Sequence, residues 1–354
     1  MSASIDQDVV GWDIGGAHLK AARARGGVIV EVVQVPCPLW KGMHELDAAF
    51  AAAEAVVGRE GRHAVTMTGE LVDYFDSRAA GVAGLAAAVA ARHPDAEIYA
   101  SGAGFVSAPA AAGLVDAVAS VNWHATAAWA AQALGEGVLI DMGSTTTDIV
   151  PFKGGRVGAR GQTDSERMAA GELVYTGATR TPLMALASRA PVRGAWAGVM
   201  AEWFANIGDV NRILGLIGPE DDQHPTADGK DKGGVNDVRR LLRMVGRDVG
   251  DLSQEEVRLL AGWFSEAQIR AASDGLGLVL SVAGLAADAP VVACGTGSAV
   301  VAEVARRAGR ALTDWSALIP LSSSADEGLW RRASIAAPAV SVALLRQLGK
   351  NSQP

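Results

Sequence analysis

The chain contains the same short pattern twice, and this repetition limits the folds that it can adopt. In residues 9–20 an apolar run leads into Asp13, a glycine pair and a second run. In residues 138–148 an apolar run leads into Asp141, a glycine, four hydroxyl side chains and another aspartate. The leading aspartates stand 128 positions apart (141 minus 13). Such a repeat predicts two diverged copies of one domain.

The second copy has the composition of a site for phosphate and a divalent metal ion. A glycine after the first aspartate permits a turn that other residues resist, and the backbone N–H groups that follow can converge on an anion. Carboxylates at strand ends suit Mg²⁺, which takes oxygen ligands and bridges to substrate phosphates. The alternative is an ordinary polar hairpin whose side chains satisfy their own turn. The candidates are Gly143, Ser144, Thr145 and Thr146 for the anion and Asp141 and Asp148 for the metal ion.

The first copy repeats this chemistry in a shorter form. Gly15 and Gly16 follow Asp13 in the turn, so the same reasoning makes Asp13 a metal ligand and the two glycines a phosphate contact. Lys20 lies on the next expected strand, from which it can reach back toward a phosphate. The alternative for Lys20 is a solvated lysine on an edge strand.

Length and composition favour two domains that act on small molecules. The chain has 354 residues, 49% of them hydrophobic, and a formal net charge of -8. This charge argues against a general nucleic-acid or acidic-membrane partner and leaves room for a locally built anion site. Cys37 and Cys294 are the only cysteines, which excludes a disulfide framework. Without a signal-peptide pattern or an apolar run of about 18 residues, the chain is expected to be soluble and cytoplasmic.

Two stretches of the first half carry candidate acid-base residues. An expected strand at 64–67 runs into Thr68 and Glu70, which is typical either of a substrate-facing loop or of a helix N-terminus capped by Thr68. His124 lies in an Ala-rich stretch, 108–134, that is expected to be helical. A single helical histidine is usually a hydrogen-bonded structural residue, but its place shortly before the second copy also fits a catalytic role.

The second half adds further candidates for anion binding. Arg180 lies in a polar run, and its planar guanidinium matches phosphate geometry. Gly295, Thr296 and Gly297 stand between an expected strand and an expected helix, and a glycine loop at a helix N-terminus can take an anion. Residues 218–234 are turn-rich and form either a functional lid or an insertion without structure of its own.

The remaining pattern predicts alternating strands and helices. Apolar runs bounded by glycine predict strands, and Ala-rich or helically periodic stretches predict helices. A capping box from Ser253 to Glu256 opens the longest expected helix. The expected strands are 9–13, 19–24, 28–35, 64–67, 97–100, 149–152 and 290–294, and the expected helices are 43–57, 77–92, 108–134, 239–246, 253–285 and 299–307.

Two Asp-x-Gly hairpins and a strand-loop-helix near the C-terminus make the chain resemble the superfamily of acetate and sugar kinases, Hsp70 and actin. The resemblance implies an α/β fold with two duplicated ribonuclease H-like domains and a central cleft. It assigns residues 1–135 to a first actin-like ATPase-type domain and residues 136–354 to a second, with a helical insertion around 183–285. In this superfamily residues 294–298 would contact the nucleotide base, and Gly-Thr-Gly stands here where Gly-Gly is usual.

A closer resemblance covers nearly the whole chain. Several motifs, in the same order, are similar to those of hydantoinase/oxoprolinase-related proteins linked to tetrahydromethanopterin one-carbon metabolism, whose archaeal members are methanofuran synthases. The motifs are residues 11–17 (GWDIGGA), 66–71 (TMTGEL), 122–126 (NWHAT), 140–148 (IDMGSTTTD), 163–167 (TDSER), 171–177 (GELVYTG) and 225–229 (PTADG).

This family resemblance implies a transferase. Its reaction condenses an aminomethyl-furanmethanol diphosphate with the phenol of a tyrosine or tyramine derivative and releases pyrophosphate, in methanofuran or methylofuran synthesis. The two hairpins and Mg²⁺ would hold the diphosphate, Lys20 and Arg180 would neutralise its charge, and ATP is not expected to be required. His124 or Glu70 would take the phenol proton, and we favour His124 because an ordinary histidine pKa lies near neutrality.

Two other functions stay open from the sequence. An ATP-dependent small-molecule kinase of the same superfamily would grip ATP with both hairpins. A nucleotide-switched chaperone-like protein is disfavoured, because two core domains leave no further partner-binding domain. The expected partners are small-molecule substrates, a furfuryl diphosphate and a phenol, without nucleic acid or membrane, and a homo-oligomer is left open.

Overall fold

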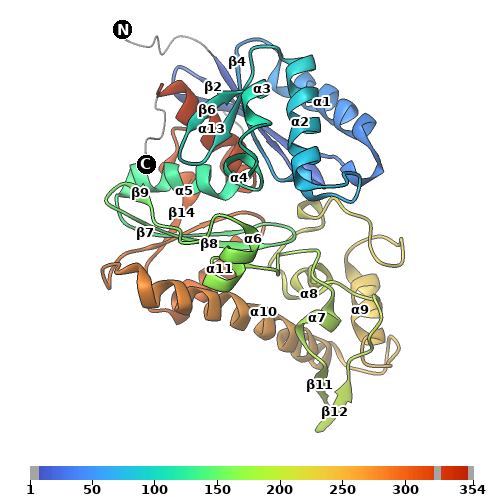
Figure 1. Cartoon of the computed structure of the whole chain (residues 1–354). Coiled ribbons are helices and arrows are strands. Elements are labelled where there is room, and N and C mark those ends of the chain that lie inside the picture. The colour runs from blue at the N-terminus through green and yellow to red at the C-terminus, as the bar shows by residue number, and fades with distance from the viewer. Residues whose placement is uncertain (1–7, 323–327, 350–354) are drawn as a thin grey trace. The chain divides into compact units, whose positions relative to one another are not determined.

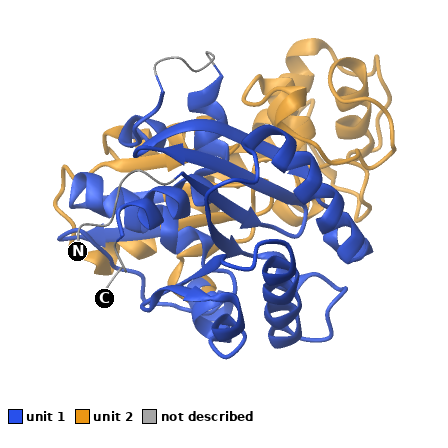
Figure 2. Cartoon of the chain, turned by 90° about the horizontal axis from the view of Figure 1, so that it is seen from above, with its two compact units in different colours: residues 1–139, 150–167, 313–354 blue, residues 140–149, 168–312 orange. Residues whose placement is uncertain are grey.

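The computed structural model describes residues 8–322 and 328–349, shown in Figure 1. The chain divides into two compact units, which Figure 2 colours separately. The first unit contains residues 1–139, 150–167 and 313–354, and the second contains residues 140–149 and 168–312. The C-terminal segment therefore returns to the first unit. The division into domains at residues 135 and 136 stays a prediction.

A mixed sheet of six strands forms the centre of the first unit. Its order is β3-β2-β1-β4-β5-β6, with β1 antiparallel to β2 and parallel to β4. The expected meander over residues 9–35 is confirmed, and β2 is an inner strand, so Lys20 does not lie on a sheet edge. The strands are β1 (Val9–Ile14), β2 (His18–Arg25), β3 (Val28–Pro36), β4 (Arg62–Met67), β5 (Glu97–Ala100) and β6 (Gly104–Ser107).

Helices pack on both faces of this sheet. Trp12 belongs to a buried cluster that also contains Phe50 of α1 (Met43–Val57) and Leu85 of α2 (Arg78–Arg92). On the other face β1 contacts α13 (Ala337–Gln347), which in turn contacts α5 (Asn122–Leu134). The approach to α13 requires a glycine at position 11, because a Cβ there would collide with the Ala339 carbonyl oxygen. The unit also contains α12 (Leu329–Ile335), η4 (Trp315–Leu318) and, between β3 and α1, η1 (Leu39–Lys41).

The expected helix over residues 108–134 is interrupted. It is split into α3 (Ala108–Ala111), α4 (Val115–Val118) and α5, and the unexpected strand β6 precedes α3. The second break lies at Ser120, whose φ of 53° places a non-glycine residue in the left-handed region. Ala-rich composition predicted helix throughout this stretch, but it does not reveal where tertiary contacts break the helix.

A second sheet has the strand order β10-β8-β7-β13-β14, and β9 pairs with β8. The expected strands at 149–152 and 290–294 are confirmed, and the expected helix at 299–307 begins one residue earlier, as α11 (Ser298–Arg307). The strands are β7 (Gly137–Met142), β8 (Thr147–Lys153), β9 (Arg156–Val157), β10 (Leu173–Val174), β13 (Val291–Cys294) and β14 (Leu312–Asp314), and α6 (Asp164–Ala170) lies between β9 and β10.

The part of the second unit between β10 and β13 is mainly helical. The longest helix is α10 (Gln254–Ala283), and the predicted Ser253 to Glu256 capping box is present at its start. Its apolar face packs against α8 in a core that contains Leu241 and Phe264, and Figure 1 shows α7, α8 and α9 toward one end of α10. The other elements are α7 (Leu183–Leu186), β11 (Arg189–Val192), β12 (Ala195–Gly198), α8 (Ile207–Leu214), η3 (Pro219–Asp221) and α9 (Gly234–Arg243). The β11–β12 hairpin was not predicted.

Within residues 8–322 and 328–349, none of the helices has the length and apolar character needed to span a membrane.

Two buried histidines support the central strand of the first unit. The Trp12 indole donates a hydrogen bond of 3.0 Å to Nδ1 of His63, and the rings of His63 and His93 stack with centroids 3.7 Å apart. Burial, followed by the charges of His63 and Arg92, lowers the pKa of His93 to about 4, although Glu54 opposes this shift. His93 is therefore neutral in the folded protein at neutral pH.

We expect the free energy of unfolding to fall as the pH drops from about 6.5 to about 4. In that window the unfolded chain binds a proton at His93 and the folded chain does not, and full protonation costs on the order of 3 kcal/mol. His93→Phe keeps an aromatic ring but cannot take the proton, so it should flatten this part of the profile measured by urea unfolding. Phe in place of the exposed His44 should leave the slope unchanged. Equal slopes for His93→Phe and the parent chain would contradict the assignment.

Candidate functional site

In the first unit the Asp-x-Gly hairpin places a carboxylate and an ammonium side by side. Asp13 pairs with Lys20 across β1 and β2, and Lys20 Nζ lies 3.5 Å from Asp13 Oδ2. Asp13 is 2% exposed, and burial raises the pKa of its carboxyl although Lys20 and Asn122 act in the opposite direction. Gly15 and Gly16 form the turn between the strands, where Gly15 N–H donates to the His18 carbonyl oxygen at 3.0 Å.

Three alternate residues around the start of α5, Ser120, Asn122 and His124, make side-chain contacts in the first unit. Ser120 Oγ donates to Glu70 Oε1 at 2.6 Å. Asn122 Nδ2 lies 3.5 Å from Asp13 Oδ1. His124 Nδ1 and the Tyr99 hydroxyl oxygen lie 2.8 Å apart, at hydrogen-bond distance. One short segment thus contacts both predicted acidic residues of the first unit and carries the predicted histidine.

His124 does not have the pKa of an ordinary histidine. Burial, followed by the charge of Arg167, lowers its pKa to about 4. The Arg167 guanidinium stacks 3.8 Å from the centre of the Trp123 ring beside it, and Arg167 is 1% exposed. The imidazole is therefore neutral at pH 7 but is a weaker proton acceptor than its ordinary pKa suggests. The reason for which the sequence favoured His124 as the base does not hold in this fold.

Glu70 lies in η2 (Gly69–Leu71), directly after β4. It is 1% exposed, and burial raises the pKa of its carboxyl against the effects of Ser120 and Arg78. A carboxyl with a raised pKa is a better proton acceptor than an ordinary glutamate. Thr68 is the N-cap residue of η2 but makes no side-chain cap, so a short helix does start here and only the predicted capping by Thr68 is wrong. The helix α2 starts later, where Ser77 Oγ accepts from Ala80 N–H.

The left-handed backbone at Ser120 gives a testable stability difference. Ser120→Ala removes the hydrogen bond to buried Glu70 and keeps the strained φ, so we expect a loss of about 2 kcal/mol in the free energy of unfolding. Ser120→Gly removes the same bond but relieves the strain, so its loss should be smaller by about 1 kcal/mol. Chemical unfolding of both variants measures the difference. Equal stabilities would show that no strain is stored at this residue.

In the second unit the loop between β7 and β8 exposes hydrogen-bond donors. Gly143 N–H closes the loop onto the Thr146 carbonyl oxygen at 3.0 Å. Among the described residues, the backbone N–H groups of Ser144, Thr145 and Thr146 have no hydrogen-bond acceptor. All three residues are half-buried and carry hydroxyl groups. The loop therefore presents three N–H groups and three hydroxyls from consecutive residues, which is the donor set that an anion needs.

Residues 176–180 hold this loop from one side. Ala178 N–H donates to the Gly143 carbonyl oxygen at 2.8 Å, and Arg180 N–H donates to the Ser144 carbonyl oxygen at 2.9 Å. These bonds turn the loop carbonyls toward residues 176–180 and leave the N–H groups for another partner. The guanidinium of exposed Arg180 reaches Thr145 Oγ1 at 3.4 Å, so the predicted anion-binding arginine and the predicted anion-binding loop are neighbours.

The glycine loop before α11 packs against the end of β7. Gly295 has φ +83°, and a Cβ at this position would lie 2.5 Å from Asp141 Oδ1. Gly297 N–H donates to the Met142 carbonyl oxygen at 2.8 Å, and Thr296 lies between the two glycines. Asp141 is the second-last residue of β7, and Asp148 lies on the neighbouring β8, where it pairs with Leu173 of β10. The structure thus brings together the predicted residues of the second unit.

The aspartate carboxylates of each hairpin suit a Mg²⁺ ion whose other ligands are mainly substrate oxygens and water. No group of three or more His, Cys, Asp or Glu side chains that could hold a metal ion occurs in the part of the chain that the structure describes. Mg²⁺ commonly uses one or two carboxylates together with waters and phosphates, and the aspartates at the hairpins match that pattern. A cation beside Asp13 would also offset the burial that raises the pKa of this carboxyl.

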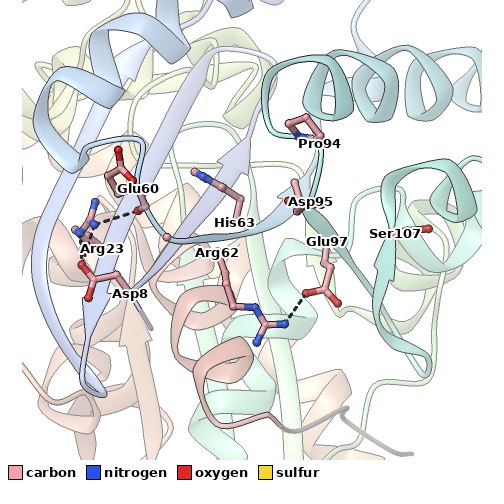
Figure 3. Close-up of a pocket in the computed structure, with 11 residues that line it drawn as sticks. Asp8, Arg23, Glu60, Arg62, His63, Pro94, Asp95, Glu97 and Ser107 are labelled. Carbon is pink, nitrogen blue, oxygen red and sulfur yellow. Dashed lines mark hydrogen bonds and ion pairs between the residues drawn. The ribbon is translucent and has the colours of Figure 1, made fainter. Parts of the chain in front are cut away.

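A surface hollow of about 890 Å³ in the first unit lies at the opposite end of the strands (Figure 3). Most of its lining residues lie at or before the starts of β1, β4 and β5, and the others are Arg23 of β2 and Ser107 at the end of β6. Asp13 and Glu70, in contrast, lie at the carboxyl ends of β1 and β4. Its arginines are already paired, Arg23 with Asp8 at 2.8 Å and Arg62 with Glu97 at 3.2 Å. Ligands of α/β sheets bind at the carboxyl ends of strands, so this hollow is not the candidate site.

Several residues of these two regions escaped the sequence reasoning. Ser120 and Tyr99 contact the predicted residues Glu70 and His124 but belong to no motif or spacing pattern. Arg167 lies in the motif at 163–167, but no role was predicted for it beside His124. Gln268 of α10 donates hydrogen bonds to residues 176 and 177. The sequence gives one indication of it, because it is a polar residue on the apolar helix face that carries Phe264 and Ala272. Whether the predicted side chains act in catalysis or binding stays a prediction.

Comparison with known proteins gives the family. Residues 62–311 match the sequence profile described as Hydantoinase/oxoprolinase. The chain belongs to the hydantoinase/oxoprolinase family. A relative in this comparison is the Methanocaldococcus jannaschii protein named (4-{4-[2-(gamma-L-glutamylamino)ethyl]phenoxymethyl}furan-2-yl)methanamine synthase, which is 33% identical over 252 residues, 70% of this chain and 74% of that protein. A Methanococcus vannielii protein of the same name is 37% identical over 119 residues, 34% of this chain and 53% of that protein.

A solved structure supports the fold of this hydantoinase/oxoprolinase-family chain. The nucleotide-free structure of an acetone carboxylase aligns with a TM-score of 0.57 at 13% identity, over 96% of this chain and 70% of that chain. The α/β fold of the acetate and sugar kinase, Hsp70 and actin superfamily, predicted from the two hairpins, is confirmed.

Proposed function

We propose that this chain is a biosynthetic transferase of methanofuran or methylofuran synthesis. Relatives named as synthases of a phenoxymethyl-furan methanamine support this role. The product in that name is an aryl ether, in which a phenol oxygen is joined to the carbon attached to a furan ring. The finer proposal is that the substrates are an aminomethyl-furanmethanol diphosphate and the phenol of a tyrosine or tyramine derivative.

The reaction balances without a further reactant. The phenol oxygen attacks the exocyclic carbon of the furan, the bond between that carbon and the diphosphate oxygen breaks, and pyrophosphate leaves with the bonding electrons. The phenol proton passes to a base. The furan ring delocalises positive charge that develops on the carbon, so most of the protein's task is to hold the diphosphate and stabilise its growing negative charge.

The observation that carries the proposal is the loop between β7 and β8. It offers unpaired N–H groups at Ser144, Thr145 and Thr146 within the described residues, and Arg180 stands beside it. Oriented N–H groups and a guanidinium are the donors that diphosphate oxygens accept. The Gly295 to Gly297 loop at the start of α11 adds backbone that can approach an anion closely.

The hairpin aspartates and Lys20 have the chemistry for the rest of the task, Asp13 and Lys20 in the first unit and Asp141 and Asp148 in the second. Asp13, Asp141 and Asp148 would hold Mg²⁺, which when bound would neutralise charge on the diphosphate. Lys20 would contribute a second positive charge, and its half-buried ammonium beside Asp13 keeps it oriented. Gly15 and Gly16 would allow close approach of phosphate to the first hairpin.

Two residues of the first unit are the candidates for the proton acceptor. His124 is neutral at pH 7 and thus able to accept, but its pKa of about 4 makes it weak. Glu70 has a raised pKa, which favours it as the acceptor. In this proposal the protein works in the cytoplasm on small molecules with Mg²⁺ and without ATP, nucleic acid or membrane.

Isotope tracing tests the direction of the attack. A phenol acceptor labelled with heavy oxygen at its hydroxyl is incubated with the furfuryl diphosphate and Mg²⁺, and ether and pyrophosphate are analysed by mass spectrometry. The proposal predicts the label in the ether and none in the pyrophosphate. In a parallel reaction with ATP added, label in a phosphate ester of the acceptor and no labelled ether would instead support a small-molecule kinase and overturn the proposal.

A further inference from the structure

Residues 143–146, between β7 and β8, are called the anion loop below. The backbone carbonyl groups of residues 176, 177 and 178, beside this loop, accept hydrogen bonds from buried side chains of three different elements. Thr147 Oγ1 on β8 donates to the Thr176 carbonyl oxygen at 2.7 Å. Gln268 Nε2 on α10 donates to the Gly177 carbonyl oxygen at 2.7 Å. Asn211 Nδ2 on α8 donates to the Ala178 carbonyl oxygen at 2.9 Å. The three donor residues are each 0% exposed.

Gln268 and Asn211 also contact each other. Asn211 Nδ2 lies 3.5 Å from Gln268 Oε1, and Gln268 Nε2 makes a second bond of 3.0 Å to Thr176 Oγ1. A side-chain amide is the group that this place requires, because it can donate to two acceptors while its oxygen accepts from a neighbour. Leucine or methionine would fill the same space but leave buried acceptors without their donors.

The helix α8, which carries Asn211, is itself held by ion pairs. On α8, Asp209 and Arg212 flank Asn211 and belong to a buried ionic network with α9. Arg212 Nε lies 2.9 Å from Asp237 Oδ2, and Arg240 Nε lies 2.8 Å from Asp209 Oδ1. A buried network whose members all have partners is rigid, so α8 offers Asn211 a fixed position from which to hold residues 176–180.

The consequence reaches the loop between β7 and β8. The carbonyl groups of residues 176–178 accept hydrogen bonds from Thr147, Gln268 and Asn211. The N–H groups of residues 178–180 donate to the carbonyl oxygens of Gly143 and Ser144. Those bonds take up the loop carbonyls. Two hydrogen bonds therefore connect the Gln268 amide with the anion loop: Gln268 Nε2 donates to the Gly177 carbonyl oxygen, and Ala178 N–H donates to the Gly143 carbonyl oxygen.

We infer that Gln268 and Asn211 are positioning residues for anion binding: from α10 and α8 they fix residues 176–180, and through them the anion loop and Arg180. This inference rests on the proposed function, since it takes the diphosphate as the ligand of the loop. It assigns to the helical part of the second unit a role in substrate affinity, and neither residue needs to touch the substrate.

Pyrophosphate binding by the full chain, measured by titration calorimetry with Mg²⁺, tests the inference. Gln268→Met is expected to raise the pyrophosphate dissociation constant about 10-fold. In turnover assays it should raise the KM of the diphosphate substrate and leave the KM of the phenol unchanged. Asn211→Ala is the second variant, with the same expected pattern if Gln268→Met does not fold.

Two reference variants separate the outcomes. Val257→Ala lies in the same helix and in the buried core of the unit, so it lowers stability without touching the loop and should leave pyrophosphate affinity within about 2-fold. Arg180→Ala removes a proposed direct contact and should weaken binding. Unchanged affinity in Gln268→Met and Asn211→Ala, with weak binding in Arg180→Ala, overturns the inference alone. A parent chain that binds no pyrophosphate overturns both the inference and the proposed function.

Discussion

Asp13→Asn is expected to lower kcat by about 100-fold or more while the protein stays folded. Asparagine keeps the size of the side chain and its hydrogen bonding but removes the charge that would hold Mg²⁺ and that pairs with Lys20. Because Asp13 is almost completely buried and burial raises the pKa of its carboxyl, loss of the charge should not lower the thermal unfolding midpoint. Activity and Tm measured on the same preparation give both quantities.

Asp8→Asn serves as the control for this substitution. Asp8 directly precedes β1 and pairs with Arg23 of β2, so its replacement changes an ion pair beside the other end of β1 and leaves the proposed site intact. We expect its kcat to stay near that of the parent chain. Parent-level turnover in Asp13→Asn would contradict the assignment of the first hairpin to metal and phosphate binding.

Gly177→Ala should remove pyrophosphate binding and lower turnover by about 100-fold. A Cβ at residue 177 would lie 2.5 Å from Thr145 N and 2.6 Å from the Ser144 carbonyl carbon. Backbone atoms at such distances must move, so the anion loop is pushed away from residues 176–180. The overpacking should also reduce the free energy of unfolding by about 1 to 3 kcal/mol. Calorimetric titration and urea unfolding measure the two effects.

Gly277→Ala is the matched control in the same unit. Gly277 lies within α10, and among the described residues no heavy atom beyond its chain neighbours and the adjoining helix backbone lies within 4 Å of the place where its Cβ would stand. Alanine there should raise stability by up to about 1 kcal/mol because it favours helix, and pyrophosphate affinity should not change. If Gly177→Ala binds pyrophosphate as tightly as Gly277→Ala, the packing of the loop against residues 176–180 has no part in binding.

Local pattern was sufficient to predict the two Asp-x-Gly hairpins and the helices α1, α2, α10 and α11. Strand β1 is apolar up to Asp13, and a glycine turn follows, so its hydrophobic run and its end are both visible in the sequence. The same holds for α10, whose capping box marks its start. These features depend on neighbours in the chain, and a sequence shows neighbours directly.

Features that depend on distant partners were not predicted. The break at Ser120 is accompanied by its bond to Glu70, fifty positions away, which no local pattern reports. The pKa of His124 depends on burial and on Arg167, so an ordinary value gave a misleading argument for its role. Gln268 acts on residues 176 and 177 across the fold, and only its polar character on an apolar helix face pointed to it.

The measurement that tests the central claim most directly is product formation without nucleotide. Purified protein, the furfuryl diphosphate, a tyrosine or tyramine acceptor and Mg²⁺ are incubated with no ATP, and ether and pyrophosphate are quantified over time. The proposed transferase predicts both products in equal amounts, and none when the diphosphate is replaced by the free alcohol. Absence of ether, together with ATP-dependent phosphorylation of either substrate, would contradict it.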